Sequence, residues 1–152
     1  MIINIRKIKL SDKEDILQWR NDINSRKNSL NTKLLNNDEH HEWYTKIIHK
    51  YSDTCFIAEN GKKKLGFIFY KIKSYNKLYV SINLNPKFRG KGIGSKILIL
   101  SSKKLIINGF KGIFYAKIKK NNTPSINSFT KAYYIKNRTY DDYVLFSYKV
   151  KK

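Results

Sequence analysis

Several residue types are scarce in this 152-residue sequence, which has one cysteine, two prolines, seven glycines and 11 acidic residues against 32 Lys and Arg. The lone Cys55 excludes an internal disulfide framework and a metal cluster of the Cys/His kind. No stretch approaches the roughly 18 apolar residues of a membrane-spanning helix, and residues 1–15 become charged too early for a signal peptide. We therefore expect a soluble, cytoplasmic protein with neither a metal ion nor a membrane partner.

The excess of basic residues gives a formal net charge of +21 at pH 7. Lysines occur in every segment beside abundant Asn and Ile, whereas a nucleic-acid binder usually concentrates Lys and Arg on one stripe with aromatic residues between them. We therefore predict no nucleic-acid partner. A basic surface still raises the rate of encounter with polyanionic small molecules.

The stretch over residues 79–105 is the most informative part of the chain. It reads as a buried strand, a turn containing Gly90, Gly92 and Gly94, and then a helix. Glycine allows a ligand to approach the backbone closely, and a helix start presents unpaired N–H groups and a positive dipole end. The stretch therefore predicts a phosphate site. The face of the helix predicted to pack on the sheet carries Ile93, Ile97, Leu98, Leu100 and Leu105.

Two common phosphate motifs do not fit this stretch. The glycines are spaced G-x-G-x-G, not the G-x-G-x-x-G of dinucleotide sites, and the P-loop spacing is absent. Arg89-x-x-Gly92-x-Gly94 after a strand that ends in Asn85-Pro86 instead resembles the acetyl-CoA pyrophosphate motif of the GNAT superfamily of acyl-CoA N-acyltransferases. The structural alternative is a tight strand-to-helix turn with solvated basic residues. The resemblance implies that acetyl-CoA is bound by Leu84, Asn85, Arg89, Gly90, Lys91, Gly92, Ile93, Gly94, Ser95, Asn122, Ser125 and Phe129.

The order of the predicted elements supports the same resemblance. The pattern predicts strands at 2–8, 54–59, 64–73, 79–84, 112–118 and 143–150. It predicts a first helix that Ser11 caps and that runs to about Trp19, and further helices from near Asp38, after Gly92 and after Asn122. This order resembles that of the GNAT fold. It implies an α/β (α+β, three-layer) architecture, with a mixed, mostly antiparallel sheet that is splayed at the central strand and has helices on both faces. No repeat or linker interrupts the chain, so we expect one domain over residues 1–152.

The first third of the chain carries a narrower resemblance. The strings WRND at 19–22, RKNS at 26–29 and EHHEWY at 39–44, with SINL at 81–84, are similar to the signature of the nucleotide-sugar N-acetyltransferases of the pseudaminic and legionaminic acid pathways. Acetyltransferases that act on ribosomal protein N-termini share a looser version. The resemblance implies substrate binding by Arg20, Asn21, Arg26, His40, Trp43, Tyr79 and Ser81.

Most of these residues also have a purely structural interpretation. Trp19 and Trp43 occupy apolar positions of predicted helices, where aromatic residues belong to the core more often than to a ligand site. Arg20 and Asn21 at a helix end could satisfy its last carbonyl groups. His40 at a helix start could hydrogen-bond a neighbouring loop.

Transfer of an acetyl group to an amine requires an unprotonated amine, a polarised thioester carbonyl and a way for the thiolate to leave. The resemblance implies that the backbone N–H of Leu84 or Asn85, at the splay of the central strand, points at the carbonyl oxygen. The expected catalytic contribution of this strand is therefore a backbone group.

Two catalytic side chains of the superfamily are missing. Phe129 stands where relatives have a Tyr that protonates the thiolate, and Tyr79 stands where many have a Glu. We name Tyr133 as the candidate acid and Glu59, His40 or a water chain as the candidate base. An amino sugar is less basic than a lysine side chain, whose pKa is about 10.4, so the base has little to do.

The sequence thus predicts an enzyme that transfers an acetyl group from acetyl-CoA to a UDP-linked amino-deoxy sugar in the biosynthesis of nonulosonic acids for surface or flagellin glycans. It would act as a monomer or homodimer on a small-molecule substrate. Two alternatives remain open: acetylation of protein N-termini, and a non-catalytic acyl-CoA-binding module, which the missing Tyr and Glu make plausible.

Overall fold

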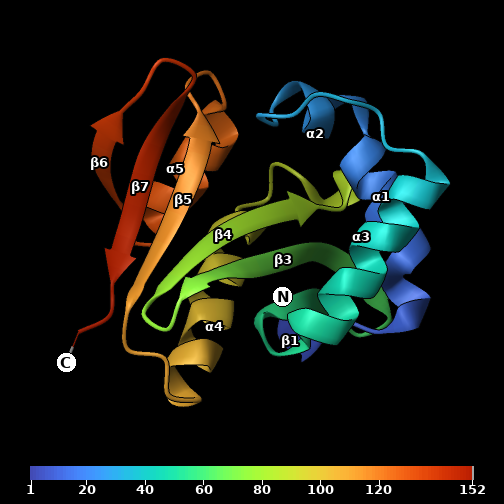
Figure 1. Cartoon of the computed structure of the whole chain (residues 1–152), viewed down its shortest axis with the longest axis horizontal. Coiled ribbons are helices and arrows are strands. Elements are labelled where there is room, and N and C mark those ends of the chain that lie inside the picture. Colours follow the sequence, from blue (N-terminus) through green and yellow to red (C-terminus); the bar gives the residue numbers. More distant parts are fainter. Residues whose placement is uncertain (152) are drawn as a thin grey trace.

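A computed structural model describes residues 1–151, and its strands form one seven-stranded mixed sheet in the order β1-β2-β3-β4-β5-β7-β6 (Figure 1). Every pairing is antiparallel except that of β4 with β5. The strands are β1 (Asn4–Lys7), β2 (Cys55–Asn60), β3 (Lys63–Ser74), β4 (Lys77–Leu84), β5 (Ile113–Lys119), β6 (Ile135–Thr139) and β7 (Tyr143–Lys149). The helices are α1 (Lys13–Asn21), α2 (Ile23–Lys27), α3 (Asn37–Lys50), α4 (Ile93–Ile107) and α5 (Thr123–Lys131).

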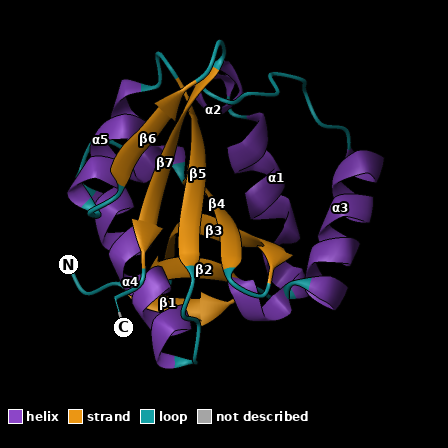
Figure 2. Cartoon of the chain, turned by 60° about the vertical axis from the view of Figure 1, so that its left-hand side comes forward, coloured by secondary structure: helices purple, strands orange, loops and turns teal. Residues whose placement is uncertain are grey.

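Strands β4 and β5 separate after a short parallel contact. They pair only at Lys77↔Ile113, Leu78↔Phe114 and Tyr79↔Tyr115, whereas β4 stays paired with β3 as far as Leu84. Figure 1 shows the two strands diverging beyond this contact, and Figure 2 shows α4 and α5 on the opposite side of the sheet from α1 and α3. The predicted mixed sheet with a splay at its central strand is therefore confirmed.

Two apolar cores hold helices against opposite faces of the sheet. One core lies beneath α4 and α5 and includes Phe114, Ile97 and Leu98. The other lies beneath α1 and α3 and includes Tyr44 and Phe67. In Figure 1, α4 and α5 lie behind the sheet, and α1 and α3 lie in front of its right-hand end, so that no helix within residues 1–151 covers the front of β5 and β7.

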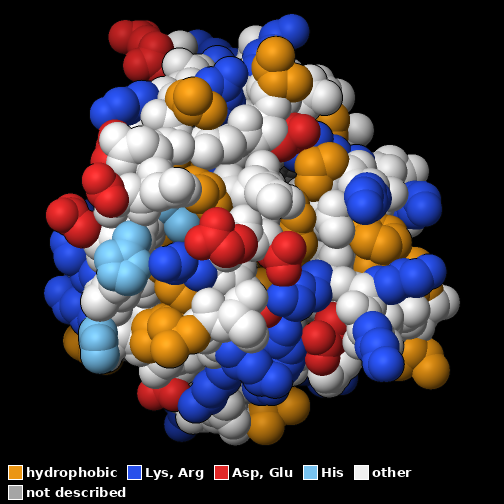
Figure 3. Space-filling model, turned by 90° about the vertical axis from the view of Figure 1, so that its right-hand side faces the viewer, with side chains coloured by type: hydrophobic (Ala, Val, Ile, Leu, Met, Phe, Trp, Pro, Cys, Tyr) orange, Lys and Arg blue, Asp and Glu red, His pale blue; other side chains and the backbone are white. Residues whose placement is uncertain are grey.

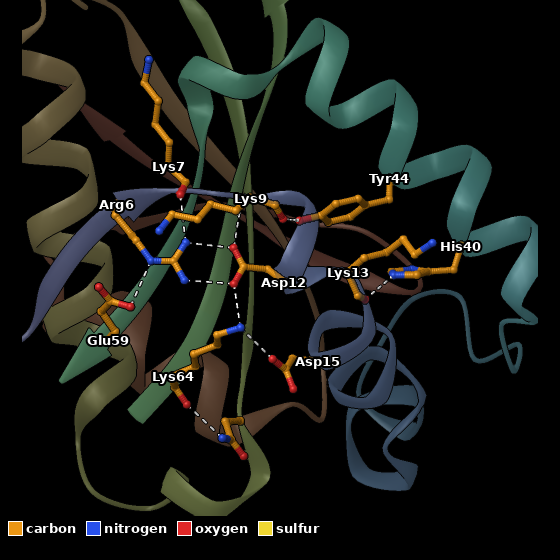
Figure 4. A network of polar contacts seen from close by, with 11 residues as sticks. Arg6, Lys7, Lys9, Asp12, Lys13, Asp15, His40, Tyr44, Glu59 and Lys64 are labelled. Carbon is orange, nitrogen blue, oxygen red and sulfur yellow. Dashed lines mark hydrogen bonds and ion pairs between the residues drawn. The ribbon is translucent and has the colours of Figure 1, made fainter. Parts of the chain in front are cut away.

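A buried carboxylate fixes the start of α1 to the sheet. Asp12, which is fully buried, accepts two hydrogen bonds from Arg6 at 2.8 and 2.9 Å and one from the Lys9 N–H at 2.8 Å, and it pairs with Lys64 at 2.8 Å (Figure 4). Burial alone would raise the pKa of Asp12, but the hydrogen bonds from Arg6 and Lys64 lower it to about 2. Arg6 also binds Glu59, at 3.0 Å.

This network explains one error in the sequence prediction. Ser11 was predicted to cap the first helix, but residues 10–12 form a 3-10 turn and Asp12 occupies the N-cap of α1. The ion pairs of the Asp12 carboxylate with Arg6 and Lys64 fix Asp12 at the start of α1, and this accounts for the shift of the N-cap from Ser11 to Asp12.

Three other predictions about the elements were incomplete or wrong. Helix α2 and strand β6 were missed, because both lack buried residues and so give no apolar periodicity. Leu100 was predicted to face the sheet, but it is on the exposed side of α4. The other four apolar residues of that predicted face, Ile93, Ile97, Leu98 and Leu105, are buried.

Candidate functional site

The glycine turn before α4 forms an open cradle. Gly90 and Gly92 have φ angles of 76° and 70°, in the left-handed region that favours glycine, and a Cβ added to either would meet no atom within 4 Å. Gly92 is the N-cap of α4, where no side chain caps the helix, and the first turn contains no acidic residue. The first N–H groups of α4 therefore face open space, and the turn fits a phosphate-bearing ligand such as acetyl-CoA.

Gly94 has a different role from the two turn glycines. A Cβ at Gly94 would lie 2.9 Å from the Ser128 Oγ, so the absence of a side chain permits the close approach of α4 and α5. The adjacent Ile93 is buried in the core, and the Ser95 hydroxyl donates to the Gly92 carbonyl at 3.2 Å. These residues can offer their backbone N–H groups to a ligand, whereas the exposed Lys91 can offer its side-chain charge.

Arg89 points away from the glycine turn. Its guanidinium pairs with Asp22 at 2.7 Å and donates to the Ser25 hydroxyl. It therefore ties the turn before α4 to the corner between α1 and α2. In this arrangement the Arg89 guanidinium would not contact a phosphate bound at the turn directly, and would act on it only as a nearby positive charge.

Only one of the two candidate backbone N–H groups at the splay is available. The Asn85 N–H donates to the Leu65 carbonyl at 2.8 Å, and the Asn85 side chain binds Lys64 and Lys87 backbone groups. Successive amides of an antiparallel strand point in opposite directions, so the Leu84 N–H points away from β3. It faces the gap where β5 no longer pairs with β4.

The predicted residues of α5 fall into three environments. Asn122 caps the helix by accepting from the Ser125 N–H and donates to the Asn28 carbonyl, each at 3.3 Å, which places both residues at the end of α5 near the α2–α3 loop. Phe129 is 2% exposed and packs edge-on against Tyr134, so it belongs to the core. Tyr133 lies past the other end of the helix, with a φ of 71° and 71% exposure.

The positions of Tyr133 and Glu59 give no support to their predicted catalytic roles. The nine residues of α5 span roughly 13 Å at 1.5 Å per residue, and this separates Tyr133 from Asn122. Glu59 is on β2, two strand spacings or about 10 Å from β4. Its carboxylate is already bound to Arg6.

Three predicted acceptor residues form a stack over the sheet face opposite α4. The Arg20 guanidinium carbon lies 3.9 Å from the centroid of the Trp43 ring, and His40 stacks on the same ring at 5.6 Å. The His40 Nε2 lies 2.8 Å from the Lys13 carbonyl, to which it must donate (Figure 4). The His40 Nδ1 lies 3.3 Å from the Arg20 guanidinium. A neutral His40 that accepts from Arg20 at Nδ1 satisfies both contacts.

The charges in this stack are poorly solvated. Burial lowers the pKa of Arg20 to about 10 and also lowers the pKa of His40. Among the described residues, no carboxylate lies within ion-pair distance of Arg20. A partly buried guanidinium without a counter-charge is suited to an anionic ligand.

The other predicted acceptor residues are not gathered at this stack. The Asn21 side chain is bound to both backbone groups of Leu35 at 2.8 Å, so it fixes the α2–α3 loop. The Nε atom of Arg26 is buried, with no hydrogen-bond partner among the described residues. Tyr79 and the exposed Ser81 lie on β4, on the face away from α4.

Two hollows lie at opposite ends of the molecule. One, of about 480 Å³, is lined by Leu30, Lys119, Asp142 and Tyr143. The other, of about 400 Å³, includes Leu105 and Asn108 at the C-terminal end of α4. Helix α4 has 15 residues and is therefore roughly 22 Å long, so the second hollow is remote from the glycine turn. Sequence reasoning missed Lys119 and Tyr143, because only the register of β5 against β7 makes them cross-strand partners on one face of the sheet.

Basic side chains are numerous on the face of the molecule that Figure 3 shows. Figure 3 shows Lys and Arg side chains spread over one face with Asp and Glu between them. Within residues 1–151 there is no group of three or more His, Cys, Asp and Glu that could hold a metal ion. None of the helices described is long and apolar enough to cross a membrane.

Comparisons with known proteins agree with this geometry. The sequence pattern of the acetyltransferase (GNAT) family matches residues 14–133. No curated protein sequence shows significant similarity. The structure is similar to Campylobacter jejuni N-acetyltransferase PseH in complex with acetyl coenzyme A, at 18% identity and a TM-score of 0.72 over 97% of this chain and 99% of that chain.

Two further similar structures are of acetyltransferases whose names give other acceptors, a ribosomal protein and spermidine. Ribosomal-protein-alanine N-acetyltransferase from Brucella melitensis is 17% identical, with a TM-score of 0.77 over 97% of this chain and 99% of that chain. Spermidine N-acetyltransferase from Vibrio cholerae, in complex with CoA and spermine, is 16% identical, with a TM-score of 0.80 over 97% and 95%. At these identities the likeness shows the fold alone.

Proposed function

We propose that this chain, which belongs to the acetyltransferase (GNAT) family, acetylates the amine of a small anionic acceptor. The proposed acceptor is a UDP-linked amino-deoxy sugar. Membership of the family makes the chain an N-acetyltransferase that uses acetyl-CoA, which sets aside the non-catalytic alternative. The proposal concerns the acceptor and the residues that serve it.

The observation that carries the proposal is the unpaired Arg20. Its guanidinium is fixed between Trp43 and His40, partly out of water and without a carboxylate. An acceptor with phosphate groups would supply the missing negative charge, and a desolvated Arg binds phosphate strongly. A polyamine would instead meet Arg20 and the exposed Lys73 and Lys117, so repulsion disfavours a polycationic acceptor.

Several groups near the splay would support the chemistry. Acetyl-CoA supplies the acetyl group as a thioester, and the Gly92 turn and the start of α4 would hold its pyrophosphate. The Leu84 N–H would donate to the thioester carbonyl oxygen, where negative charge develops. Burial raises the pKa of Tyr79, so its hydroxyl stays protonated and can donate a hydrogen bond to the acceptor but cannot serve as the base.

Proton transfer then needs no dedicated side chain. The amine of an amino sugar is less basic than that of lysine, with its pKa of about 10.4, so a sizeable fraction is neutral near pH 8. A thiol with a pKa of about 8.5 leaves readily as the thiolate. The buried Phe129, which has no proton to give, is compatible with this route.

A protein N-terminus is the second candidate acceptor, and one observation favours it. In the part of the chain that the structure describes, the front of β5 and β7 has no helix over it, and beyond Tyr115 the edge of β5 that faces β4 has no strand partner. An extended peptide could pair with such an open edge.

The test is thiol release from acetyl-CoA with four acceptors: a UDP-linked amino-deoxy sugar, the free amino sugar, a peptide with a free N-terminus, and spermidine. We expect the UDP-linked sugar to have the highest kcat/KM. Arg20→Ala should raise the acceptor KM by about tenfold or more, while the KM for acetyl-CoA changes by less than about twofold.

The matched control is Lys50→Ala. Lys50 lies on α3 and stacks on Tyr51, so this variant also removes a cation from an aromatic ring, but away from the splay. It should leave both KM values unchanged. Equal increases in both KM values for Arg20→Ala, or faster acetylation of the peptide, would contradict the proposal.

A further inference from the structure

Four tyrosines from β4, β5 and the β6–β7 hairpin lie close together on the open face of the sheet. Tyr79 stacks on Tyr115 with ring centroids 5.3 Å apart and planes at 23°. Tyr140 stacks on Tyr143 at 4.7 Å and 21°. All four rings are only partly buried. We call these four residues the tyrosine cluster.

One lysine joins the two stacked pairs. The Lys117 Nζ lies 5.4 Å from the centroid of Tyr79 and 5.4 Å from that of Tyr143. Lys117 is exposed, and among the described residues no carboxylate or hydrogen-bond acceptor is bound to it. The centre of the tyrosine cluster therefore carries an uncompensated positive charge.

The cluster lines the splay and reaches the 480 Å³ hollow. Tyr79 and Tyr115 form the last pair at which β4 and β5 are joined, so their rings lie where the gap begins. Tyr143 lines the hollow with Leu30, Lys119 and Asp142. The end of α2, three residues before Leu30, is tied to β5 because Lys119 donates to the Lys27 carbonyl at 2.9 Å.

A structural role alone does not account for this arrangement. Cross-strand aromatic pairs stabilise sheets, which would explain the Tyr79–Tyr115 pair. The cation–π contacts of Lys117 stabilise its position between the two pairs, but they leave its charge without a carboxylate partner among the described residues, in a chain of net charge +21. Stacking rings beside a free cation are the groups that bind a nucleobase and its phosphates.

We propose that the tyrosine cluster, Lys117 and the adjoining hollow bind the nucleoside diphosphate part of the acceptor. The base packs on the Tyr143 ring in the hollow, where the Asp142 carboxylate can accept from a base N–H. The diphosphate extends from Lys117 toward Arg20, which the proposed function assigns to the phosphate groups, and the sugar extends toward the Leu84 N–H. This assignment rests on the proposed function, since it presumes that the acceptor is nucleotide-linked.

The direct test is the binding of UDP alone to the full chain in the presence of CoA, measured by calorimetry. Tyr143→Leu removes the stacking ring and keeps an apolar side chain, and Lys117→Met removes the charge and keeps the length. We expect each to weaken UDP binding by about tenfold, and Lys117→Met to reduce the salt dependence of binding as well. The KM for the UDP-linked sugar should rise by the same factor.

Two matched controls come from outside the cluster. Tyr75→Leu removes a tyrosine that is 92% exposed and outside the cluster, and Lys62→Met removes an exposed lysine in the β2–β3 hairpin. Both should bind UDP within about twofold of the unchanged protein. Melting temperatures of all four variants separate a loss of binding from a loss of structure.

The outcomes for the cluster and for the proposed function can be told apart. If the UDP-linked sugar is acetylated but Tyr143→Leu and Lys117→Met behave like their controls, the tyrosine cluster is structural and the assignment is overturned. If UDP does not bind and the peptide or spermidine is acetylated instead, the proposed function fails and the assignment with it. UDP binding that depends on both residues supports the assignment even where no sugar of the panel is a substrate.

Discussion

Replacement of Asp12 by Asn isolates the ionic part of the network that anchors α1. The pKa of Asp12 falls from an ordinary 3.8 to about 2, and each pKa unit corresponds to about 1.36 kcal/mol, so ionisation of the carboxylate adds about 2 kcal/mol to stability at neutral pH. In Asp12→Asn, Arg6 keeps Glu59 and Lys64 keeps Asp15. We therefore expect a loss of about 2 kcal/mol, below the 3–5 kcal/mol typical of a buried charge left without any partner.

The pH dependence follows from the sign of this shift. A depressed carboxyl pKa adds stability that is fully present above the unfolded pKa near 3.8 and is lost as pH falls toward about 2. By linkage, roughly half of the 2 kcal/mol should be gone at pH 3. The difference in stability between the unchanged protein and Asp12→Asn should therefore narrow between pH 5 and pH 3.

Urea unfolding at pH 7, 5 and 3 measures this difference. Thermal unfolding at pH 7 should show a Tm lower by about 4–8 °C. Asp53→Asn is the control, because Asp53 pairs with Lys7 at 2.6 Å but is 83% exposed; it should cost less than about 1 kcal/mol. A loss below 0.5 kcal/mol for Asp12→Asn, or a difference that stays constant down to pH 3, would refute the reasoning.

Three shorter predictions concern the site and its supports. Gly92→Ala should weaken acetyl-CoA binding, measured by calorimetry, at least tenfold. Gly61 has a similar φ of 59° and also lies in open space, so Gly61→Ala should reduce the stability of the fold about as much as Gly92→Ala does, without affecting acetyl-CoA binding. Tyr134→Phe should be neutral or stabilising in urea unfolding, because its buried hydroxyl has no partner among the described residues, whereas Tyr70→Phe breaks a buried hydrogen bond and should cost about 1–2 kcal/mol. Burial lowers the pKa of His40, so stability should fall as pH drops below about 6.5, and His40→Gln should flatten that fall; an unchanged slope would contradict this.

Local signals in the sequence were sufficient for most of the fold. Asn36 and Asn122 cap α3 and α5 through hydrogen bonds that span only three residues, and the Asn60-Gly61 pair marks the β2–β3 hairpin. The glycine-rich turn before a helix was also predicted, and the structure adds that Gly90 and Gly92 in it have a left-handed backbone. Each of these features depends on a few consecutive residues, so it can be predicted from the sequence alone. Elements with no buried residue, such as α2 and β6, gave no such signal.

The partners of the side chains were decided only by the tertiary structure. The sequence placed Arg89 and Gly94 in one motif, but Asp22 draws Arg89 toward α2, and Ser128 makes Gly94 a packing residue. The register of β4 against β3 engages the Asn85 amide and leaves that of Leu84 facing the splay. The sequence by itself determined where a phosphate could bind, because helix starts and glycine turns are local. Contacts between strands far apart in the chain determine which groups surround the acceptor, as in the pairing of Tyr79 with Tyr115. Patterns within a few consecutive residues do not predict such contacts.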